Sequence, residues 1–184
     1  MINSGFWGKL NKPLFVLAPM ADVTDCAFRQ IIAKYGKPDV FWTEFVSADG
    51  LAHPKAREKL LIDLKFEKDE HPIVAQIFGG KPENIKIAST LCKELGFDGI
   101  DINMGCPDKS IEKQGAGAAM MKDSKLASEI IKAVKDGIKD SKNKDETFKI
   151  LIIVAFSILV ILAAYNSFNY FLQIAGNPNY SSNH

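Results

Sequence analysis

Residues 99–119 read GIDINMGCPDKSIEKQGAGAA, and this stretch decides how the rest of the chain is interpreted. The run GIDINM is close to continuously apolar, which is typical of a parallel strand that is covered on both faces. Cys106 follows it between Gly105 and Pro107. The proline disfavours the helical conformation for the cysteine, and the glycine lets a ligand approach closely. The stretch therefore predicts a buried strand that opens into an extended loop carrying one thiol.

Three more apolar runs precede this one, and each suits one buried strand: LFVLAPM at residues 14–20, VFWTEFV at 40–46 and PIVAQIF at 72–78. Between and after these runs, apolar residues recur at intervals of three and four, which predicts amphipathic helices. The helical positions are Phe28, Ile31, Ile32 and Tyr35; Ala88, Leu91, Cys92 and Leu95; and Ala127, Ile130, Ile131 and Val134. The alternation predicts right-handed βαβ units and a parallel sheet, as in a (β/α)8 barrel or a doubly wound sheet.

The composition is that of an ordinary globular domain, with 184 residues, 47% hydrophobic residues, 24% charged residues and a net charge of +1. A net charge near zero gives no general argument for nucleic-acid binding, so any RNA contact would need a local basic patch. The three cysteines are widely spaced and the three histidines are scattered. We therefore expect neither a disulfide framework nor a metal site, and we expect a reducing, cytoplasmic location.

The residues most able to bind a ligand or to catalyse a reaction lie at the carboxyl ends of the predicted strands, because ligands of parallel α/β proteins bind there. Gln76 and Asn103 are amides set among apolar residues, and a buried amide can donate and accept hydrogen bonds toward a heterocycle such as a flavin or a uracil. Each amide could equally cap a neighbouring loop. Cys106 could act as a general acid or as a nucleophile, and the absence of a nearby histidine in the sequence favours the acid. Cys26 and Cys92 are expected to be structural.

The run KQGAGAA at residues 113–119 has two closely spaced glycines, as nucleotide-binding loops do. It does not directly follow a strand and lacks the third glycine of a dinucleotide fingerprint, so we reject that interpretation. A flexible loop whose Lys109 and Lys113 face a polyanion remains open, as does a merely solvated surface.

Five motifs in order carry a resemblance to a known family: APMADVTDCAFR, TEFVSADGL, PIVAQIFGGKPENI, GFDGIDINMGCP and KQGAGAAMM. Together they resemble the tRNA-dihydrouridine synthases, which are flavoenzymes with a TIM barrel and a smaller helical RNA-binding domain. The resemblance covers residues 14–137. It implies that this chain is a partial (β/α)8 TIM barrel of about four βα units, followed by a hydrophobic C-terminal helix.

The resemblance also implies a reaction and its site. FMN, reduced by NADPH, gives a hydride to C6 of a uridine in tRNA, and a cysteine that matches Cys106 protonates C5. Pro19, Met20 and Ala21 match the segment that lies against the flavin, Gln76 matches a glutamine that contacts the flavin ring, and Asn103 matches an asparagine between flavin and uracil. The target base must leave its stack, so the substrate tRNA needs a cationic surface around the pocket. No metal is implied.

The chain departs from the family after residue 140. The family's VKTR-like lysine motif is absent from DSKNKDETFKILIIVAFS, and the later strands and the RNA-binding domain are not recognisable. Half a barrel would leave open edges at the first and fourth strands. The alternative is therefore a non-catalytic truncated remnant. Another flavin-dependent TIM-barrel reductase of small molecules is a third interpretation, in which the order of motifs would differ.

Residues 150–165, ILIIVAFSILVILAAY, are apolar apart from one serine. As a helix extended to residue 171, the segment would reach about 33 Å, enough to cross a bilayer core. Three interpretations stay open: a transmembrane helix that tethers the domain to the cytoplasmic membrane face, a buried strand and helix, or a frameshifted or fused end. The expected organisation is a flavin-binding domain at 1–140, a charged linker at 141–149, this hydrophobic segment at 150–172 and a polar tail at 173–184.

Overall fold

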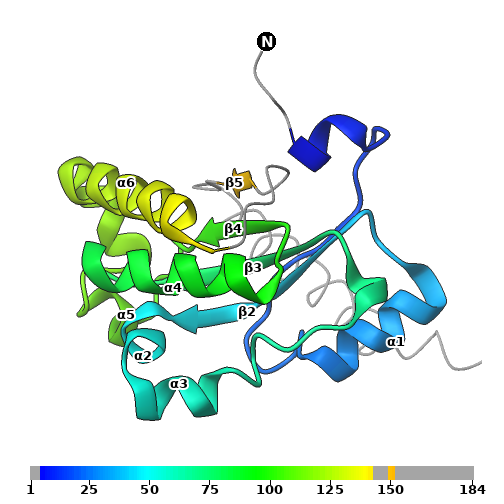
Figure 1. The fold of residues 1–184 in the computed structure, drawn as a ribbon, viewed down its shortest axis with the longest axis horizontal. Helices are drawn as coiled ribbons and strands as arrows, with labels where there is room; N and C mark the ends of the chain where they lie inside the picture. The colour runs from blue at the N-terminus through cyan, green and yellow to red at the C-terminus, as the bar shows by residue number, and fades with distance from the viewer. Residues whose placement is uncertain (1–4, 143–148, 152–184) are drawn as a thin grey trace, which may run out of the picture.

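The computed structural model describes residues 5–142 and 149–151 of the chain. Strands and helices alternate along it, as the sequence predicts (Figure 1). The strands are β1 (Val16–Leu17), β2 (Val40–Ser47), β3 (Ile73–Phe78), β4 (Gly99–Ile102) and β5 (Lys149–Leu151). The helices are α1 (Cys26–Gly36), α2 (Ala48–Ala52), α3 (Pro54–Leu60), α4 (Pro82–Leu95), α5 (Lys109–Glu112) and α6 (Ser124–Asp140), with 3-10 turns η1 (Gly5–Lys9), η2 (Lys68–Glu70) and η3 (Gly117–Lys122).

The five strands form one parallel sheet in the order β1-β2-β3-β4-β5. Strand order that follows chain order is the arrangement of a (β/α)8 barrel, whereas a doubly wound sheet reverses direction at a switch point. The structure therefore confirms the α/β fold class and the partial barrel.

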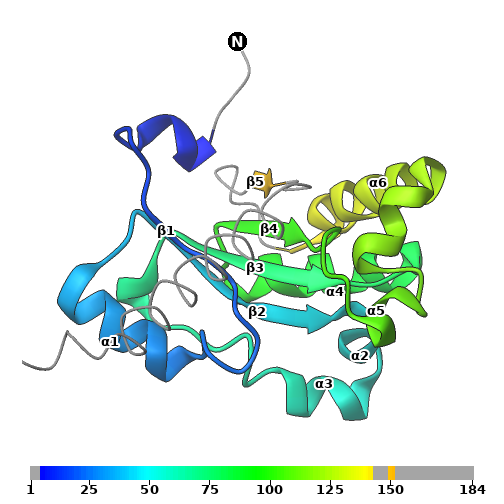
Figure 2. The ribbon, with the colours of Figure 1, turned by 180° about the vertical axis from the view of Figure 1, so that it is seen from behind.

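The two faces of the sheet differ. Helices α4 and α6 lie side by side over one face, and the main core fills the space between them and the strands (Figure 1). The strands are seen from the other side in Figure 2. On that face Val40, Trp42 and Val74 form a small second cluster, against which Phe6 and Trp7 of η1 pack. In a closed barrel this second face would be the interior.

Local sequence signals set the helix ends where the structure has them. The Asp25 carboxylate accepts a hydrogen bond from the Phe28 amide at 2.7 Å and so caps the start of α1. Helix α4 begins at Pro82 and ends before Gly96, which has a φ of +93° that favours glycine.

Strand β5 corrects one expectation. It pairs with β4 from Gly99↔Lys149 to Asp101↔Leu151, so the fourth strand is not the open edge that the sequence predicted. The strand spans the expected boundary at 149/150 between the charged linker and the hydrophobic segment. Its three residues can add to the sheet because the edge of β4 presents unpaired backbone N–H and C=O groups. Residues 152–172, the polar tail and the expected C-terminal helix lie outside the described residues. Among the described helices, none is long and apolar enough to cross a membrane.

Helices α4 and α6 touch at Gly137, and this contact yields a prediction. A Cβ atom at Gly137 would lie 2.4 Å from the Lys86 carbonyl oxygen and 3.1 Å from the Ser89 Cβ. We expect Gly137→Ala to lower the free energy of unfolding by about 1–3 kcal/mol through overpacking, although alanine favours a helix more than glycine does. The control is Gly36→Ala at the end of α1, where nothing lies within 4 Å of the added methyl. Urea unfolding measures both, and equal midpoints for Gly137→Ala and the parent would contradict the tight contact.

Candidate functional site at the carboxyl ends of the strands

The register of β3 and β4 places three polar residues on one face of the sheet. Gln76 and Asp101 are direct partners across the two strands, and Asn103 follows two residues after Asp101. Side chains alternate along a strand, so all three lie on the face opposite the main core, as Val74 does. They are almost completely buried, with 5%, 2% and 4% of their surface exposed for Gln76, Asp101 and Asn103. Buried polar groups need hydrogen-bond partners, and these residues supply them to one another.

A continuous chain of hydrogen bonds joins this group to the Cys106 loop. Gln76 Nε2 donates to Asp101 Oδ2 at 2.6 Å, and Asn103 Nδ2 donates to Gln76 Oε1 at 3.4 Å. Asn103 Oδ1 in turn accepts hydrogen bonds from the amides of Gly105 at 3.2 Å and Cys106 at 3.0 Å. The structure thus brings together three of the predicted site residues, Gln76, Asn103 and Cys106.

The Cys106 thiol is half-buried at the mouth of β4. The described histidines do not serve it: His71 lies before β3 and its Nδ1 is 2.6 Å from Asp98 Oδ2, and His53 lies between α2 and α3. A nucleophilic cysteine needs an adjacent base to activate it, so this arrangement suits a proton donor better than a nucleophile.

The glycine-rich segment is a packed support for the Cys106 loop, which corrects the interpretation as a flexible loop. The Ala118 amide donates to the Cys106 carbonyl at 2.9 Å. A Cβ at Gly117, whose φ is +59°, would lie 2.6 Å from that carbonyl oxygen. A Cβ at Gly80 would lie 2.2 Å from the Gln114 carbonyl oxygen. The two glycines therefore let neighbouring backbone segments pack closely together, and this packing supports the Cys106 loop.

Pro19, Met20 and Ala21 form a separate part of the candidate site, after β1. Thr24 closes a turn on Met20, because the Met20 amide donates to Thr24 Oγ1 and the Thr24 amide donates to the Met20 carbonyl, both at 3.0 Å. Asp22 has a φ of +59°, and its amide donates to the carboxylate of Glu44, which lies within β2. This turn lies at the same edge of the sheet, but no hydrogen bond among the described residues joins it to Gln76, Asn103 or Cys106.

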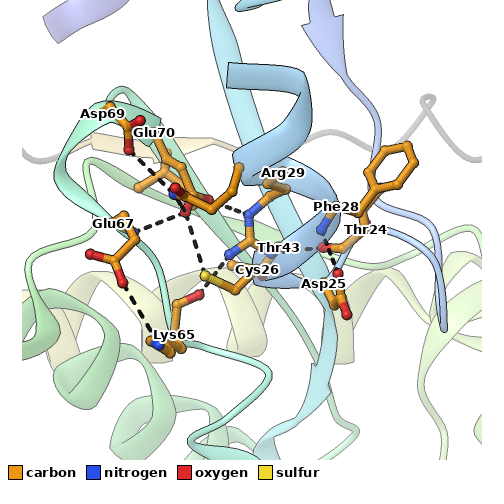
Figure 3. A network of polar contacts seen from close by, with 12 residues as sticks. Thr24, Asp25, Cys26, Phe28, Arg29, Thr43, Lys65, Glu67, Asp69 and Glu70 are labelled. Carbon is orange, nitrogen blue, oxygen red and sulfur yellow. Dashed lines mark hydrogen bonds and ion pairs between the residues drawn. The ribbon is translucent and has the colours of Figure 1, made fainter. Parts of the chain in front are cut away.

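A buried ion pair holds this turn, and no sequence pattern pointed to it. Arg29 Nε and Glu70 Oε2 are 2.5 Å apart, and both side chains are fully buried. Arg29 also donates to the carbonyls of Thr24 at 2.7 Å and Lys65 at 2.6 Å (Figure 3). Arg29 therefore links α1, the turn after β1 and the segment before β3.

The remaining cysteines fit the structural roles expected of them. Cys26 Sγ lies 3.7 Å from Glu70 Oε1, and burial together with that carboxylate raises the pKa of the Cys26 thiol. Cys92 is fully buried in the main core, and burial raises the pKa of its thiol to about 12. Both shifts keep these thiols protonated and unreactive.

A hollow of about 1090 Å³ lies beside the candidate site and is lined by acidic side chains. Burial and the nearby Asp63 raise the pKa of Glu44, and burial and Asp22 raise the pKa of Asp63. Of the predicted site residues, only Ala21 lines this hollow. Lys65 and Lys68 also line it, but the acidic side chains outnumber them, so the hollow is a poor match for the phosphates of a nucleic acid. Within residues 5–142 and 149–151, no group of three or more acidic, histidine or cysteine side chains is arranged to hold a metal ion.

Comparisons with known proteins identify what the chain resembles. The family model of dihydrouridine synthases matches residues 16–152. The chain is 45% identical over 136 residues to a probable tRNA-dihydrouridine synthase 2 of Bacillus subtilis, and 43% and 42% identical over the same length to probable tRNA-dihydrouridine synthases of Staphylococcus aureus and Staphylococcus epidermidis. Each alignment covers 74% of this chain and 42% of the relative. The chain thus spans about two fifths of the length of these curated relatives.

Proposed function

Because the chain belongs to the dihydrouridine synthase family, we propose that it carries the chemistry of a tRNA-dihydrouridine synthase, the reduction of the C5–C6 double bond of uridine in tRNA. In this proposal Cys106 is the catalytic proton donor to C5. Flavin mononucleotide, reduced by NADPH, supplies the hydride for C6 when it is bound. The family implies a tRNA-modifying oxidoreductase, and the cofactors, the site residues and the cytoplasmic location are part of the proposal.

The observation that best supports the proposal is the hydrogen-bonded chain from Gln76 through Asn103 to the Cys106 loop. Each carboxamide has two N–H groups and uses one of them in this chain. Within the described part of the molecule, the second N–H of Gln76 and of Asn103 remains available. These two N–H donors suit the carbonyl oxygens and ring nitrogens at the edge of a flavin or a uracil, so the residues fit the group. We assign Gln76, Asn103, Pro19, Met20 and Ala21 to the flavin, the last three as an apolar surface.

The protein's own contribution to the reaction is to hold and deliver a proton. The loop holds Cys106 by its backbone, through the Asn103 side chain on one side and the Ala118 amide on the other. The half-buried thiol donates its proton to C5 of the uridine as negative charge develops there. The uridine must leave its stack to reach the thiol, because a paired base would be inaccessible.

Two measurements on the purified full chain test the proposal. FMN titration with flavin fluorescence as the signal tests cofactor binding, and mass spectrometry of digested tRNA tests the gain of two hydrogens per target uridine in the presence of NADPH. We expect saturable FMN binding and dihydrouridine in the product. A chain that binds no FMN and forms no dihydrouridine would overturn the proposal and favour the non-catalytic alternative.

A further inference from the structure

We infer that Asp101 is a positioning residue for this site: its carboxylate sets the orientation of the Gln76 and Asn103 carboxamides and, through them, of the Cys106 loop. The inference rests on the proposed function for its consequence in catalysis, but the orientation itself follows from the geometry. Asp101 lies on β4 with only 2% of its surface exposed, directly opposite Gln76 in the ladder.

Asp101 Oδ2 acts as a hydrogen-bond acceptor in its position. The indole Nε1 of Trp42 donates to it at 3.2 Å, and an indole N–H can only donate. The same oxygen lies 2.6 Å from the Gln76 carboxamide. Because Oδ2 already accepts the indole hydrogen of Trp42, the group that Gln76 turns toward it must be the NH2 and not the oxygen.

This choice propagates along the chain of hydrogen bonds. With its NH2 turned to Asp101, Gln76 presents Oε1 to Asn103, whose NH2 donates to it at 3.4 Å. Asn103 must then present Oδ1 to the loop, where the amides of Gly105 and Cys106 can only donate. Every bond points toward Asp101. A flipped Gln76 would place oxygen against oxygen at Asp101 and NH2 against NH2 at Asn103, both repulsive.

The orientation is fixed from both ends of the chain of hydrogen bonds, by the accepting oxygen of Asp101 at one end and by the loop amides, which can only donate, at the other. Two carboxamides in contact can satisfy each other in either orientation, because each carries both a donor and an acceptor. A charge-assisted hydrogen bond is also roughly twice as strong as a neutral one. Asp101 therefore supplies, from the strand, the acceptor that holds Gln76 and Asn103 in the orientation that the loop amides also require.

The experiment compares Asp101→Asn with the parent chain by two readouts. Residue-resolved amide hydrogen exchange by NMR reports on the Gly105 and Cys106 amides in the absence of cofactor, and fluorescence titration reports the Kd for FMN. We expect exchange at these two amides to rise by about tenfold and the Kd for FMN to rise by about tenfold, the equivalent of one charge-assisted hydrogen bond. The matched control is Asp98→Asn, which removes a carboxylate next to the other end of β4, where it accepts from the Ile73 amide at 2.8 Å. The control should move neither readout.

A double variant separates the effect of Asp101 on carboxamide orientation from a purely structural role of its side chain. In Asp101→Asn combined with Gln76→Glu, the acceptor-only group moves to position 76, where it can accept both from the new amide and from Asn103 Nδ2. We expect exchange at Gly105 and Cys106 to return to within about twofold of the parent rate. A purely structural role for the carboxylate at position 101 would predict no such rescue.

The outcomes distinguish this inference from the proposed function. Parental exchange and FMN affinity in Asp101→Asn, or no rescue in the double variant, would overturn the inference. A parent chain that binds no FMN would overturn the proposed function, while the exchange rates would still decide the role of Asp101. If Asp101→Asn does not fold, Gln76→Glu alone decides, because two facing carboxylates must speed exchange at Gly105 and Cys106; parental rates there would refute the inference.

Discussion

Replacing Arg29 with methionine is expected to lower the free energy of unfolding by about 3–5 kcal/mol, the largest stability loss that we predict for a single substitution. Arg29 and Glu70 are fully buried, and their side chains are 2.5 Å apart. Methionine preserves most of the side-chain volume but leaves the Glu70 carboxylate without its counter-charge. It also removes the donors to the Thr24 and Lys65 carbonyls. An unpaired buried charge is among the few defects that reach this magnitude.

The same substitution should disturb the candidate site at a distance. Arg29 holds the Thr24 carbonyl, and Thr24 closes the turn on Met20, which we assign to the flavin. We therefore expect Arg29→Met to weaken FMN binding even under conditions where the chain stays folded.

Urea unfolding and FMN titration measure the two effects. Lys34→Met is the matched control, because Lys34 is exposed on the same helix and its replacement removes the same positive charge. The double variant Arg29→Met with Glu70→Gln should be more stable than Arg29→Met alone, because it no longer buries an unpaired charge. If Arg29→Met unfolds at the same urea concentration as Lys34→Met, the ion pair does not stabilise the fold in this way.

Periodicity was enough to predict most of this fold. The four apolar runs became β1 to β4, and the three sets of helical positions became α1, α4 and α6. For the segment that begins at residue 150, a buried strand was one of three interpretations left open, because hydrophobicity alone does not distinguish a buried strand from a helix in a long apolar run. The pairing of β5 depends on β4 offering a free ladder edge, which is a tertiary property.

Those site residues that are marked by their position at the end of a strand could be predicted from the sequence. Gln76, Asn103 and Cys106 stand where apolar runs end, and the structure joins them. Asp101 was overlooked because a carboxylate inside an apolar run reveals its role only when the register places it opposite Gln76. Arg29 and Glu70 are 41 residues apart, and each alone is indistinguishable from a surface charge. Contacts that span the fold are set by topology, which a local pattern does not contain.

Replacing Cys106 with alanine is expected to lower the rate of uridine reduction by about 10²–10⁴-fold, the usual contribution of a positioned general acid. The loop should keep its conformation, because Asn103 and Ala118 hold Cys106 through its amide and carbonyl rather than through its thiol. We therefore expect Cys106→Ala to bind FMN with the parental Kd and to unfold at the parental urea concentration. The loss should appear in the chemical step and not in assembly of the site.

The decisive measurement is single-turnover formation of dihydrouridine on a tRNA substrate, followed alongside reoxidation of the flavin. Cys26→Ala is the matched control, because Cys26 lies near Glu70 on α1 and should leave the chemical step unchanged. Cys106→Ser should stay close to the alanine variant, since a serine hydroxyl is a far weaker acid than a thiol. Parental rates in Cys106→Ala would show that another group delivers the proton to C5, and the strand-end thiol would then have to be reassigned to a structural role in its loop.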